Sequence, residues 1–405
     1  MFCTHLSLAN FRNYARLELD LSPGIAVFVG DNAQGKSNLL EALYLLATTK
    51  SFRATADREL INWRAHDSGL SFARLVASVD RAAGRAKLEV VIREDGQRAD
   101  DSPTPGPTVS KRLKLNDVPR RALEVVGAVN VVLFSPQDIE LVNGPPAPRR
   151  RYLDVTISQV DHRYIRALAH FNKVLMQRNH LLRQIREQRS RPDQLFPWDR
   201  ELVGAGSYLI QQRTITLALL GELAQDVHRQ LTGRQETLDI VYRSSVGLAS
   251  VSRGPSLPLD AVQGAFTHEL RAAQGREVAA GTSILGPHRD DLAFLVDGRD
   301  MNVFGSRGQQ RTVALALKLA EAEFLHQRIG DQPILLLDDV LSELDEPRRR
   351  HVLDAVATHQ QVVFTATDLT PFDEEFLGRA AIYRVCEGAV EALSREEVVA
   401  EYASG

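Results

Sequence analysis

The sequence predicts a mixed α/β fold in which a helical insertion divides one sheet-containing unit. Three observations support this expectation. Continuous apolar runs typical of buried strands occur near both ends of the chain, as in Ile25–Val29 and Ile334–Leu337. The long stretch Arg149–Leu231 between them has helical spacing. The glycine-rich segment Gly30–Ser37 follows a predicted strand and begins a predicted helix.

The N-terminal part is predicted to be mostly strands. Leu6–Ala9 and Leu17–Leu21 alternate apolar and polar residues with the period of two that a half-buried strand requires. Phe72–Val79 and Leu88–Ile92 are further strand candidates. The one clear helix here is Asn38–Thr49, whose leucines recur on one side.

The character of the chain changes after a last strand candidate, Val129–Phe134. Breaks at Arg191–Asp193 and Phe196–Pro197 divide the helical stretch into two long helices, which predicts an antiparallel hairpin. We expect loops at Arg98–Thr108, which holds three prolines, and at the Ser-, Gly- and Pro-containing Ser244–Pro258.

Sheet character returns toward the C-terminus. Leu292–Val296 and Met301–Phe304 flank Asp297-Gly298, which predicts a hairpin. An amphipathic helix is expected at Thr312–Leu325 and a short buried strand at Val362–Phe364. We therefore predict N-terminal and C-terminal halves of one lobe at residues 1–142 and 276–405, with a helical arm at 143–275.

Composition excludes several classes of protein. The 405 residues are 44% hydrophobic and 25% charged, with a net charge of −3, so neither a disordered chain nor a histone-like one is expected. Two distant cysteines, Cys3 and Cys386, cannot form a zinc cluster or a disulfide framework and fit a reducing cytosol. The first residues lack a signal-peptide pattern, and the apolar runs Val125–Phe134 and Thr214–Leu220 are too short to span a membrane, so we expect a cytoplasmic protein.

Gly30–Ser37 fits the P-loop pattern, with the strand and helix that the pattern requires on either side. Its glycines allow the backbone to turn amide groups onto phosphate oxygens, and the following helix adds its positive N-terminal end. Lys36 is predicted to reach the β- and γ-phosphates of a nucleotide, and the Ser37 hydroxyl to bind Mg²⁺. The alternative is an ordinary glycine-rich turn.

The predicted strand Ile334–Leu337 ends in two acids, Asp338 and Asp339. Ligand sites of open α/β sheets lie at the carboxyl ends of strands. We therefore expect Asp338 to hold Mg²⁺ through a water molecule and Asp339 to polarise the attacking water. Two acids after a strand can instead cap a helix.

Ser306–Arg311 lies between the predicted hairpin and the following helix. It offers a hydroxyl group, a glycine backbone and a helix N-terminus, which together suit a phosphate group. The alternative is a polar helix cap. Ser342–Asp345 follows the acidic pair directly.

This order of motifs resembles the ABC-type ATPase heads of the SMC class, which implies a P-loop ATPase head with a mixed sheet and an antiparallel β layer. In that class, two subunits enclose two ATP molecules between the P-loop of one and the signature segment of the other. The resemblance implies that Ser306 and Gly308 contact the γ-phosphate in trans, that Gln309 also belongs to the nucleotide site, and that Asp345 links the two sites. Gln137, in Phe134–Asp138, is similar to the residue that senses Mg²⁺ and water, and Thr367-Asp368 to a switch segment. The implied nucleotide contacts are Arg12, Gly30, Asn32, Gly35, Lys36, Ser37 and Asn38.

The chain resembles the RecF family more narrowly. The segments that carry this resemblance span essentially the whole sequence: Leu8–Tyr14, Phe134–Pro136, Gly144-Pro145, Arg149–Asp154, Gly286–Asp291 and Ser306–Arg311. The resemblance implies a DNA-binding ATPase of recombinational repair, replication restart and the SOS response. It implies ATP and Mg²⁺ as cofactors, ATP-dependent dimerisation on DNA, and help to a RecR-like mediator in loading recombinase at gaps.

Three positions differ from the usual ABC pattern. Asp339 stands where such heads usually have Glu, Thr367-Asp368 replaces the switch histidine, and Gln137 stands where relatives often carry an acid. The shorter Asp339 side chain is consistent with slow hydrolysis, which we expect DNA to stimulate.

Clusters of arginine are the candidate DNA contacts, because phosphate binding needs a high local density of positive charge. We expect Arg150, Arg183, Arg186 and Arg189 to contact DNA without reading its sequence. The other arginines of these clusters are Arg149, Arg151, Arg178, Arg191 and Arg348–Arg350. A solvated helix face is the alternative for each cluster. His288–Asp291 is either a catalytic cluster or a hydrogen-bonded turn.

Two other functions are compatible with the sequence. The nucleotide-binding subunit of a transporter would need a membrane partner, and would not usually carry the helical insertion. A metabolic P-loop NTPase would need a small acceptor substrate, and no signature segment. ATP turnover raised by a metabolite rather than by DNA would favour the second.

Overall fold

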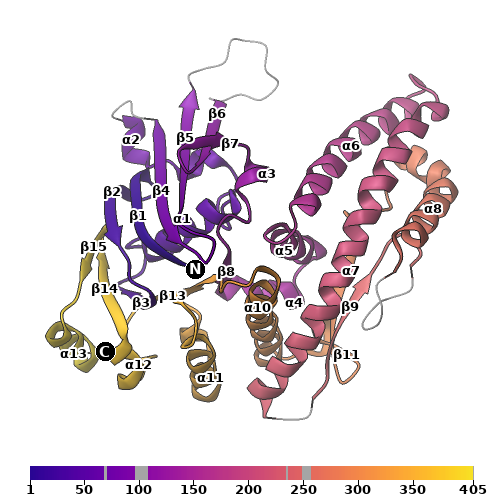
Figure 1. Ribbon diagram of the computed structural model, residues 1–405. Coiled ribbons are helices and arrows are strands. Elements are labelled where there is room, and N and C mark those ends of the chain that lie inside the picture. The colour runs from indigo at the N-terminus through magenta and orange to yellow at the C-terminus, as the bar shows by residue number, and fades with distance from the viewer. Residues whose placement is uncertain (68–70, 96–107, 234–235, 249–256, 405) are drawn as a thin grey trace. The chain divides into compact units, whose positions relative to one another are not determined.

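The computed structural model describes residues 1–405 except 68–70, 96–107, 234–235, 249–256 and 405. Contacts divide the chain into two compact units (Figure 1). The first joins Met1–Pro136 to Leu325–Gly405, and the second is Gln137–Phe324. The first unit is thus assembled from both ends of the sequence. The three-part division at residues 142 and 275 stays a prediction.

The first unit contains a six-stranded sheet. Its strands in spatial order are β15 (Ala389–Ala392), β14 (Ala380–Cys386), β3 (Gly24–Val29), β13 (Gln361–Ala366), β12 (Ile334–Asp338) and β8 (Val131–Phe134). All neighbours are parallel except β15, which is antiparallel to β14. The four strands predicted in this sheet are confirmed. Because parallel strands end at the same edge, the segments after β3, β12 and β13 emerge together.

A second six-stranded sheet of this unit is antiparallel. Its strands in order are β2 (Tyr14–Asp20), β1 (Phe2–Phe11), β4 (Phe72–Asp80), β5 (Ala86–Asp95), β6 (Thr108–Leu115) and β7 (Val118–Arg120). The four predicted strands are confirmed, whereas β6 and β7 were not predicted, since β6 has a polar, basic centre and β7 contains a proline. Of the loop predicted at Arg98–Thr108, residues 98–107 lie outside the described residues, and Thr108 begins β6.

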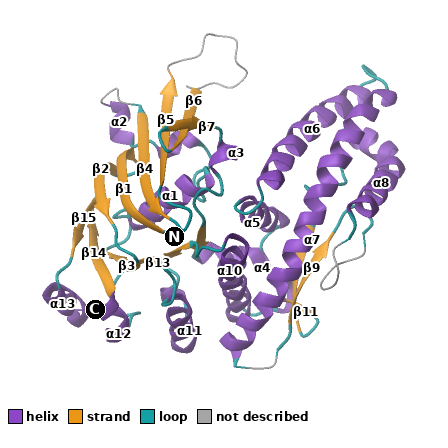
Figure 2. Ribbon diagram, viewed as in Figure 1, coloured by secondary structure: helices purple, strands orange, loops and turns teal. Residues whose placement is uncertain are grey.

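The helix α1 (Lys36–Thr48) contacts both sheets of the first unit: β8, β12 and β13 of the parallel sheet, and β4 and β5 of the antiparallel one. It matches the helix predicted at Asn38–Thr49. The fold class is therefore confirmed as a mixed sheet with an antiparallel β layer (Figure 2). The remaining helices of this unit are η1 (Asp57–Leu60), α2 (Trp63–Asp67), α3 (Ala122–Val125), η4 (Leu341–Glu343), α11 (Glu346–Val356), α12 (Glu374–Arg379) and α13 (Arg395–Ser404).

The second unit is mainly helical. After η2 (Pro136–Ile139), its helices are α4 (Glu140–Asn143), α5 (Pro146–Ser158), α6 (His162–Arg186), η3 (Pro192–Leu195), α7 (Phe196–Thr232), α8 (Leu259–Ala280), α9 (Met301–Phe304) and α10 (Arg307–Ile329). The helices α6 and α7 run antiparallel and side by side, which confirms the predicted hairpin (Figure 1). The expectation of only two helices was wrong. A further break occurs because the Asp161 side chain accepts bonds from two backbone amides and starts α6.

A three-stranded antiparallel sheet completes the second unit, in the order β11 (Arg299–Asp300), β10 (Asp291–Val296) and β9 (Leu238–Arg243). The hairpin turn at Asp297-Gly298 is confirmed, but the strand predicted at Met301–Phe304 is the helix α9. Asp300 accepts a hydrogen bond from the Asn302 amide and so caps this helix. Part of the loop predicted at Ser244–Pro258, residues 249–256, lies outside the described residues.

Among the described residues, no helix has the length and apolar character needed to cross a membrane. Both cysteines are free, with Cys3 buried and Cys386 exposed. Burial raises the pKa of the Cys3 thiol to about 12.

Candidate active site

The P-loop segment Gly30–Ser37 joins the end of β3 to the start of α1, as predicted. Gly30 and Gly35 have positive φ angles of 153° and 117°. A Cβ atom at Gly30 would lie 2.3 Å from the Val385 carbonyl oxygen, so a larger residue cannot follow β3 here. Asn32 is exposed. The loop therefore lies against β14 on one side and is open to solvent at Asn32.

Lys36 lies on the loop with its side chain folded back. Its Nζ donates hydrogen bonds to the carbonyl oxygens of Gly30 and Asp31, the latter at 2.8 Å. Burial lowers the pKa of Lys36, and the negative charges of Asp339, Asp31 and Asp338 oppose this shift. Two carbonyl groups of the loop thus hold the ammonium group. A bound phosphate could take their place as its hydrogen-bond partner.

Ser37 and Asp338 meet although they are 301 residues apart in the sequence. The Ser37 hydroxyl donates to Asp338 Oδ1 at 2.6 Å, and Thr365 Oγ1 donates to the same oxygen at 2.9 Å. Asp338 is only 8% exposed. A hydroxyl and a fixed carboxylate beside a phosphate-binding loop are the hard oxygen donors that Mg²⁺ prefers, so these residues fit the predicted ion.

Asp339 follows at the end of β12 with a left-handed φ of 49°. Its amide donates to the Thr365 carbonyl oxygen at 3.2 Å, and its own carbonyl oxygen accepts from Ser342 Oγ at 2.8 Å. Burial raises the pKa of its carboxyl group, and the nearby charges of Asp338 and Asp368 add to the effect. A carboxyl group with a raised pKa at this position suits proton transfer.

The predicted switch residues occupy turns of the same unit. Thr367 and Asp368 follow β13, where Thr367 Oγ1 donates to Asp368 Oδ2 at 3.1 Å and the Thr370 amide donates to Oδ1 at 2.9 Å. These hydrogen bonds lower the pKa of Asp368. Asp345 caps α11 by accepting from the Arg348 amide at 3.1 Å and also pairs with the Arg348 side chain.

The predicted signature residues belong to the second unit. Ser306 precedes α10, and its Oγ accepts from the Gln309 amide at 3.3 Å while Gln309 Oε1 accepts from the Ser306 amide at 3.0 Å. This reciprocal capping box leaves Ser306, Gly308 and Gln309 exposed at the helix N-terminus. Gln137 is also exposed, in η2. The helix-cap alternative therefore describes the local geometry. An exposed helix N-terminus also suits a phosphate group.

Arg12 and Asn38 are engaged by protein partners. The Arg12 guanidinium forms two bonds to the fully buried Glu41 of α1, at 2.7 and 2.8 Å. Asn38 Nδ2 donates to Asn13 Oδ1 at 2.8 Å. The structure therefore places both side chains where they brace the start of α1, and their predicted contacts with nucleotide stay predictions.

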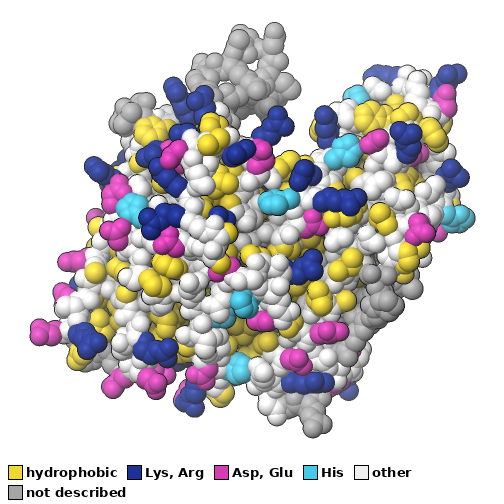
Figure 3. All heavy atoms as spheres, viewed as in Figure 1, with side chains coloured by type: hydrophobic (Ala, Val, Ile, Leu, Met, Phe, Trp, Pro, Cys, Tyr) yellow, Lys and Arg dark blue, Asp and Glu magenta, His cyan; other side chains and the backbone are white. Residues whose placement is uncertain are grey.

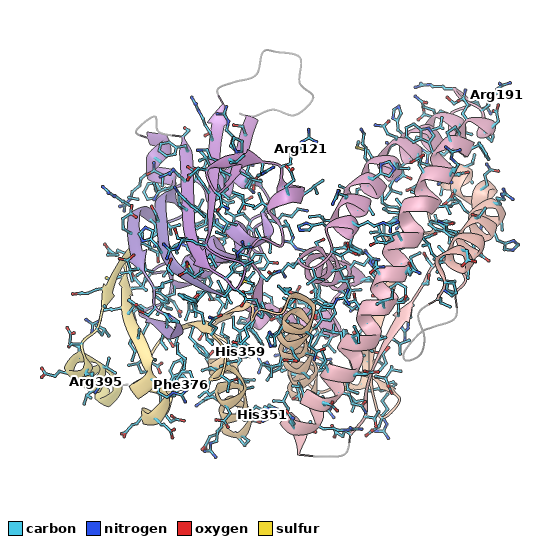
Figure 4. The ribbon with its side chains drawn as sticks, in the orientation of Figure 1. Arg121, Arg191, His351, His359, Phe376 and Arg395 are labelled. Carbon is cyan, nitrogen blue, oxygen red and sulfur yellow. The ribbon has the colours of Figure 1, made fainter. Side chains whose placement is uncertain are left out.

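The arginines of the second unit separate into buried and exposed groups. Arg183 and Arg186 are exposed on the last turns of α6, and Arg189 is exposed in the segment that follows the helix. Lys and Arg side chains lie over this end of the helical pair, where Arg191 marks the tip (Figures 3 and 4). Arg150 is half-buried and donates to the Asp290 carbonyl oxygen at 3.0 Å.

Arg178 and Arg149 were wrongly grouped with the candidate DNA contacts. Arg178 is completely buried and binds Asp199 at 2.7 Å and Glu277 at 2.6 Å, which ties α6 to α7 and α8. Arg149 is buried and pairs with Asp291 at 2.7 Å. A buried ion pair is already neutralised, so these two arginines have no charge to offer to DNA.

The segment His288–Asp291 is a hydrogen-bonded turn in this structure. Asp290 is 1% exposed and accepts from the Ser245 amide and hydroxyl, each at 2.7 Å, and from the Tyr242 hydroxyl. His288 Nε2 lies 3.3 Å from the Ser283 carbonyl oxygen. These partners are backbone and structural side chains, so the geometry favours the turn over a catalytic cluster.

The His288 turn makes stability sensitive to acid. Burial lowers the pKa of His288 from 6.5 to about 4, so the unfolded chain binds a proton more readily than the folded one. The free energy of unfolding is therefore unaffected by this histidine above about pH 6.5, and it falls by about 3 kcal/mol as the pH falls toward 4. We expect His288→Gln to flatten the loss of unfolding free energy between pH 6.5 and 4, measured by urea denaturation. An unchanged pH slope would contradict this assignment.

Sequence reasoning gave no role to three residues that shape this site. Thr365 orients Asp338 by a hydrogen bond. Asn13 Nδ2 donates to the carbonyl oxygen of the P-loop residue Gln34 at 2.7 Å. Asn13 follows Arg12 in the N-terminal motif, and both residues lie in or next to the turn from β1 to β2. The positive φ of 52° at Arg12 makes that turn tight, but no residue pattern tells which turn meets the loop.

Comparison with known proteins covers nearly the whole chain. Residues 2–374 match the RecF/RecN/SMC N-terminal domain. The DNA replication and repair protein RecF of Roseiflexus castenholzii is 48% identical over 398 residues, covering 96% of this chain and 99% of its own. RecF of Chloroflexus aurantiacus is 46% identical over 400 residues, covering 97% of this chain and 100% of its own.

Solved structures give the same result. A structure of the recombination mediator protein RecF with ATP in the RecFOR pathway has a TM-score of 0.85 and 30% identity, and covers 97% of this chain and 98% of its own. A head domain of Smc, bound to part of ScpA, has a TM-score of 0.53 at 13% identity, which shows the shared fold alone. The transporter and metabolic alternatives are not favoured by these matches. The chain belongs to the RecF family of DNA replication and repair proteins.

Proposed function

We propose that this chain binds ATP and Mg²⁺ at the P-loop, dimerises on DNA when ATP is bound, and hydrolyses ATP slowly to release it. The observation that carries the proposal is the 2.6 Å contact between Ser37 and Asp338, which brings the two halves of a nucleotide site together. The related RecF structures with ATP support the choice of nucleotide.

The protein groups divide the chemistry among them. The glycine backbone of Gly30 and Gly35 allows amides to face the phosphates, and Lys36 exchanges its carbonyl partners for the β- and γ-phosphates. Ser37 and Asp338 would hold Mg²⁺, which neutralises charge on the phosphates when bound. Asp339 polarises the attacking water, and its short side chain is consistent with a weak ATPase.

Dimerisation would use the exposed signature residues. Ser306, Gly308 and Gln309 present a helix N-terminus that can contact the γ-phosphate bound to a second copy of the chain. Asp345, Thr367 and Asp368 would relay this contact between sites, and Gln137 would respond to Mg²⁺ and water. ATP then stabilises the dimer because only the closed form contacts it from both copies.

DNA and a mediator protein complete the proposed cycle. Arg150, Arg183, Arg186 and Arg189 would contact the phosphates of duplex DNA or of a junction between single and double strands, without reading sequence. The related structures of RecF in the RecFOR pathway support a RecR-like partner. When bound to DNA, the dimer would lie at the nucleoid in the cytoplasm.

Sedimentation tests the whole proposal. The purified chain is sedimented alone, with ATP and Mg²⁺, and with ATP, Mg²⁺ and duplex DNA. We expect a monomer, then a partial dimer, then a complete dimer that sediments with the DNA. A sedimentation coefficient unchanged by ATP in the presence of DNA would contradict the proposed coupling.

Replacing Asp338 with asparagine tests the ion site separately. Asn keeps the size of the side chain and can still accept from Ser37 and Thr365, but it lacks the charge. We expect ATP binding without Mg²⁺ to stay within about threefold, and Mg²⁺-dependent hydrolysis to fall by about 100-fold. Phosphate release measured with Mg²⁺ and with a chelator checks both, and full activity of Asp338→Asn would remove Asp338 from the site.

Charge reversal at the end of α6 tests the DNA surface. We expect the double variant Arg183→Glu/Arg186→Glu to bind duplex DNA about 10-fold more weakly at low salt, because phosphate contacts depend on positive charge. The variant Arg379→Glu/Arg395→Glu changes the net charge equally at exposed positions of the first unit and serves as the control. Equal DNA affinity of the two variants would place the interface elsewhere.

A further inference from the structure

Two turns distant in sequence hold the P-loop from outside. The Gln34 carbonyl oxygen accepts a bond from Asn13 Nδ2 at 2.7 Å and another from the Gly388 amide at 3.1 Å. The Glu387 amide donates to Gln34 Oε1 at 2.6 Å. The β1–β2 turn and the β14–β15 turn therefore meet at Gln34, which none of the sequence motifs predicted.

The next carbonyl of the loop is also held. The Gly35 carbonyl oxygen accepts from the buried Tyr14 hydroxyl at 3.0 Å, and also from the Asn38 and Leu39 amides of α1 at 2.9 and 3.3 Å. In a planar trans peptide the carbonyl and the following N–H point in opposite directions. Fixing the carbonyls of Gln34 and Gly35 outward therefore turns the N–H groups of Gly35 and Lys36 toward the opposite side, where the phosphates would bind.

Asn13 fits tightly between two glycines. A Cβ atom at Gly35 would lie 2.5 Å from Asn13 Nδ2, and one at Gly388 would lie 2.7 Å from the Asn13 carbonyl oxygen. Asn13 Oδ1 accepts from Asn38 Nδ2 at 2.8 Å, so the same side chain reaches α1. The Asn13 side chain thus links the P-loop to α1. The Asn13 backbone lies against the turn between β14 and β15.

We propose that Asn13 is a positioning residue for the nucleotide phosphates, and that the Glu387-Gly388 turn keeps it in place. Asn13 does not touch the nucleotide. It orients the peptide planes that do, so a displacement of the C-terminal hairpin changes the affinity of the P-loop for phosphate. This inference rests on the proposed function, since it concerns the same nucleotide site.

The first test removes the hydrogen-bonding groups of Asn13 and of Tyr14 in separate variants. We expect Asn13→Ala to weaken binding of both ADP and ATP about 10-fold, and Tyr14→Phe, which deletes one hydroxyl group, to weaken it about fivefold. The losses are equal for the two nucleotides because the held amides serve the phosphates shared by both. The control is Asn116→Ala, in the β6–β7 turn, where the Asn116 side chain likewise accepts a hydrogen bond, from the Lys87 amide at 2.9 Å.

The second test acts through the hairpin alone. Gly388 and Gly298 occupy matching positions in two hairpin turns, with φ angles of 79° and 77° after Glu387 and Asp297, both at 47°. An alanine meets equal backbone strain at either position, but only Gly388→Ala pushes against Asn13, since no atom lies within 4 Å of a Cβ at Gly298. We expect Gly388→Ala to weaken ADP and ATP binding about 10-fold and Gly298→Ala to leave it unchanged.

Fluorescence titration with labelled ADP and ATP, together with urea unfolding without nucleotide, separates the outcomes. Wild-type chain that binds neither nucleotide contradicts the proposed function itself. Wild-type binding with unchanged affinity in Asn13→Ala and Gly388→Ala overturns only the role of Asn13. An equal loss in Asn116→Ala or Gly298→Ala would reflect general destabilisation and would also overturn it.

Discussion

The variant Lys36→Met is expected to lose at least about 100-fold in ATP affinity, because it removes the ammonium group that the P-loop carbonyls hold. Lys36 Nζ lies 2.8 Å from the Asp31 carbonyl oxygen and also contacts that of Gly30. Methionine has a similar length and fits a buried position, but it cannot bind the β- and γ-phosphates. Equilibrium titration with labelled ATP measures the loss.

The control for this experiment is Lys50→Met. Lys50 is exposed and lies just beyond the other end of α1, so its replacement removes the same charge from the same unit. We expect its ATP affinity to equal that of the unmodified chain. If Lys36→Met also binds ATP normally, the nucleotide site lies outside Gly30–Ser37.

The variant Ser306→Arg is expected to keep ATP binding by the monomer and to abolish the ATP-dependent dimer. Ser306 is exposed and belongs to the unit that does not contain the P-loop, so the nucleotide site of its own copy keeps all its residues. An arginine at the N-terminus of α10 would occupy the position proposed for the γ-phosphate bound to the second copy. It also adds a positive charge at the positive end of the helix. Sedimentation with ATP and Mg²⁺ is expected to show monomer only.

Loss of a helix cap must be separated from loss of the interface. Ser394 provides a matched control, because it forms the same reciprocal cap at the start of α13, with its amide donating to Glu397 at 2.8 Å. We expect Ser394→Arg to dimerise like the unmodified chain. Dimerisation of Ser306→Arg with ATP would show that the signature segment does not act in trans.

Local pattern predicted much of this molecule. The glycine spacing in Gly30–Ser37 and the apolar strand before Asp338 could be recognised from the sequence. Loop conformation and strand burial each require particular residue types at adjacent positions. The predicted helical hairpin is confirmed for the same reason, since a 25-residue helix such as α6 repeats its apolar spacing many times. Short elements such as α9 repeat too little of any pattern, and there the Asp300 cap decides the outcome.

Position in space was decided only by the tertiary structure. The arginines Arg178 and Arg183 have equal charge and lie on one helix, yet one is buried between Asp199 and Glu277 and the other is exposed. Sequence spacing could not separate them, because their burial depends on what α7 and α8 place beside each one.

The residue types of the nucleotide site, and the order in which its motifs occur, were predictable from the amino-acid sequence. Only the tertiary structure brought Ser37 to Asp338 and placed Asn13 between the P-loop and the C-terminal hairpin. Turn propensities and hydrophobic periodicity involve residues that are close together in the sequence, so they predict local structure and not which distant segments meet. The contact between Ser37 and Asp338, which are 301 residues apart, forms because the parallel strands β3, β13 and β12 bring their ends to one edge of a sheet.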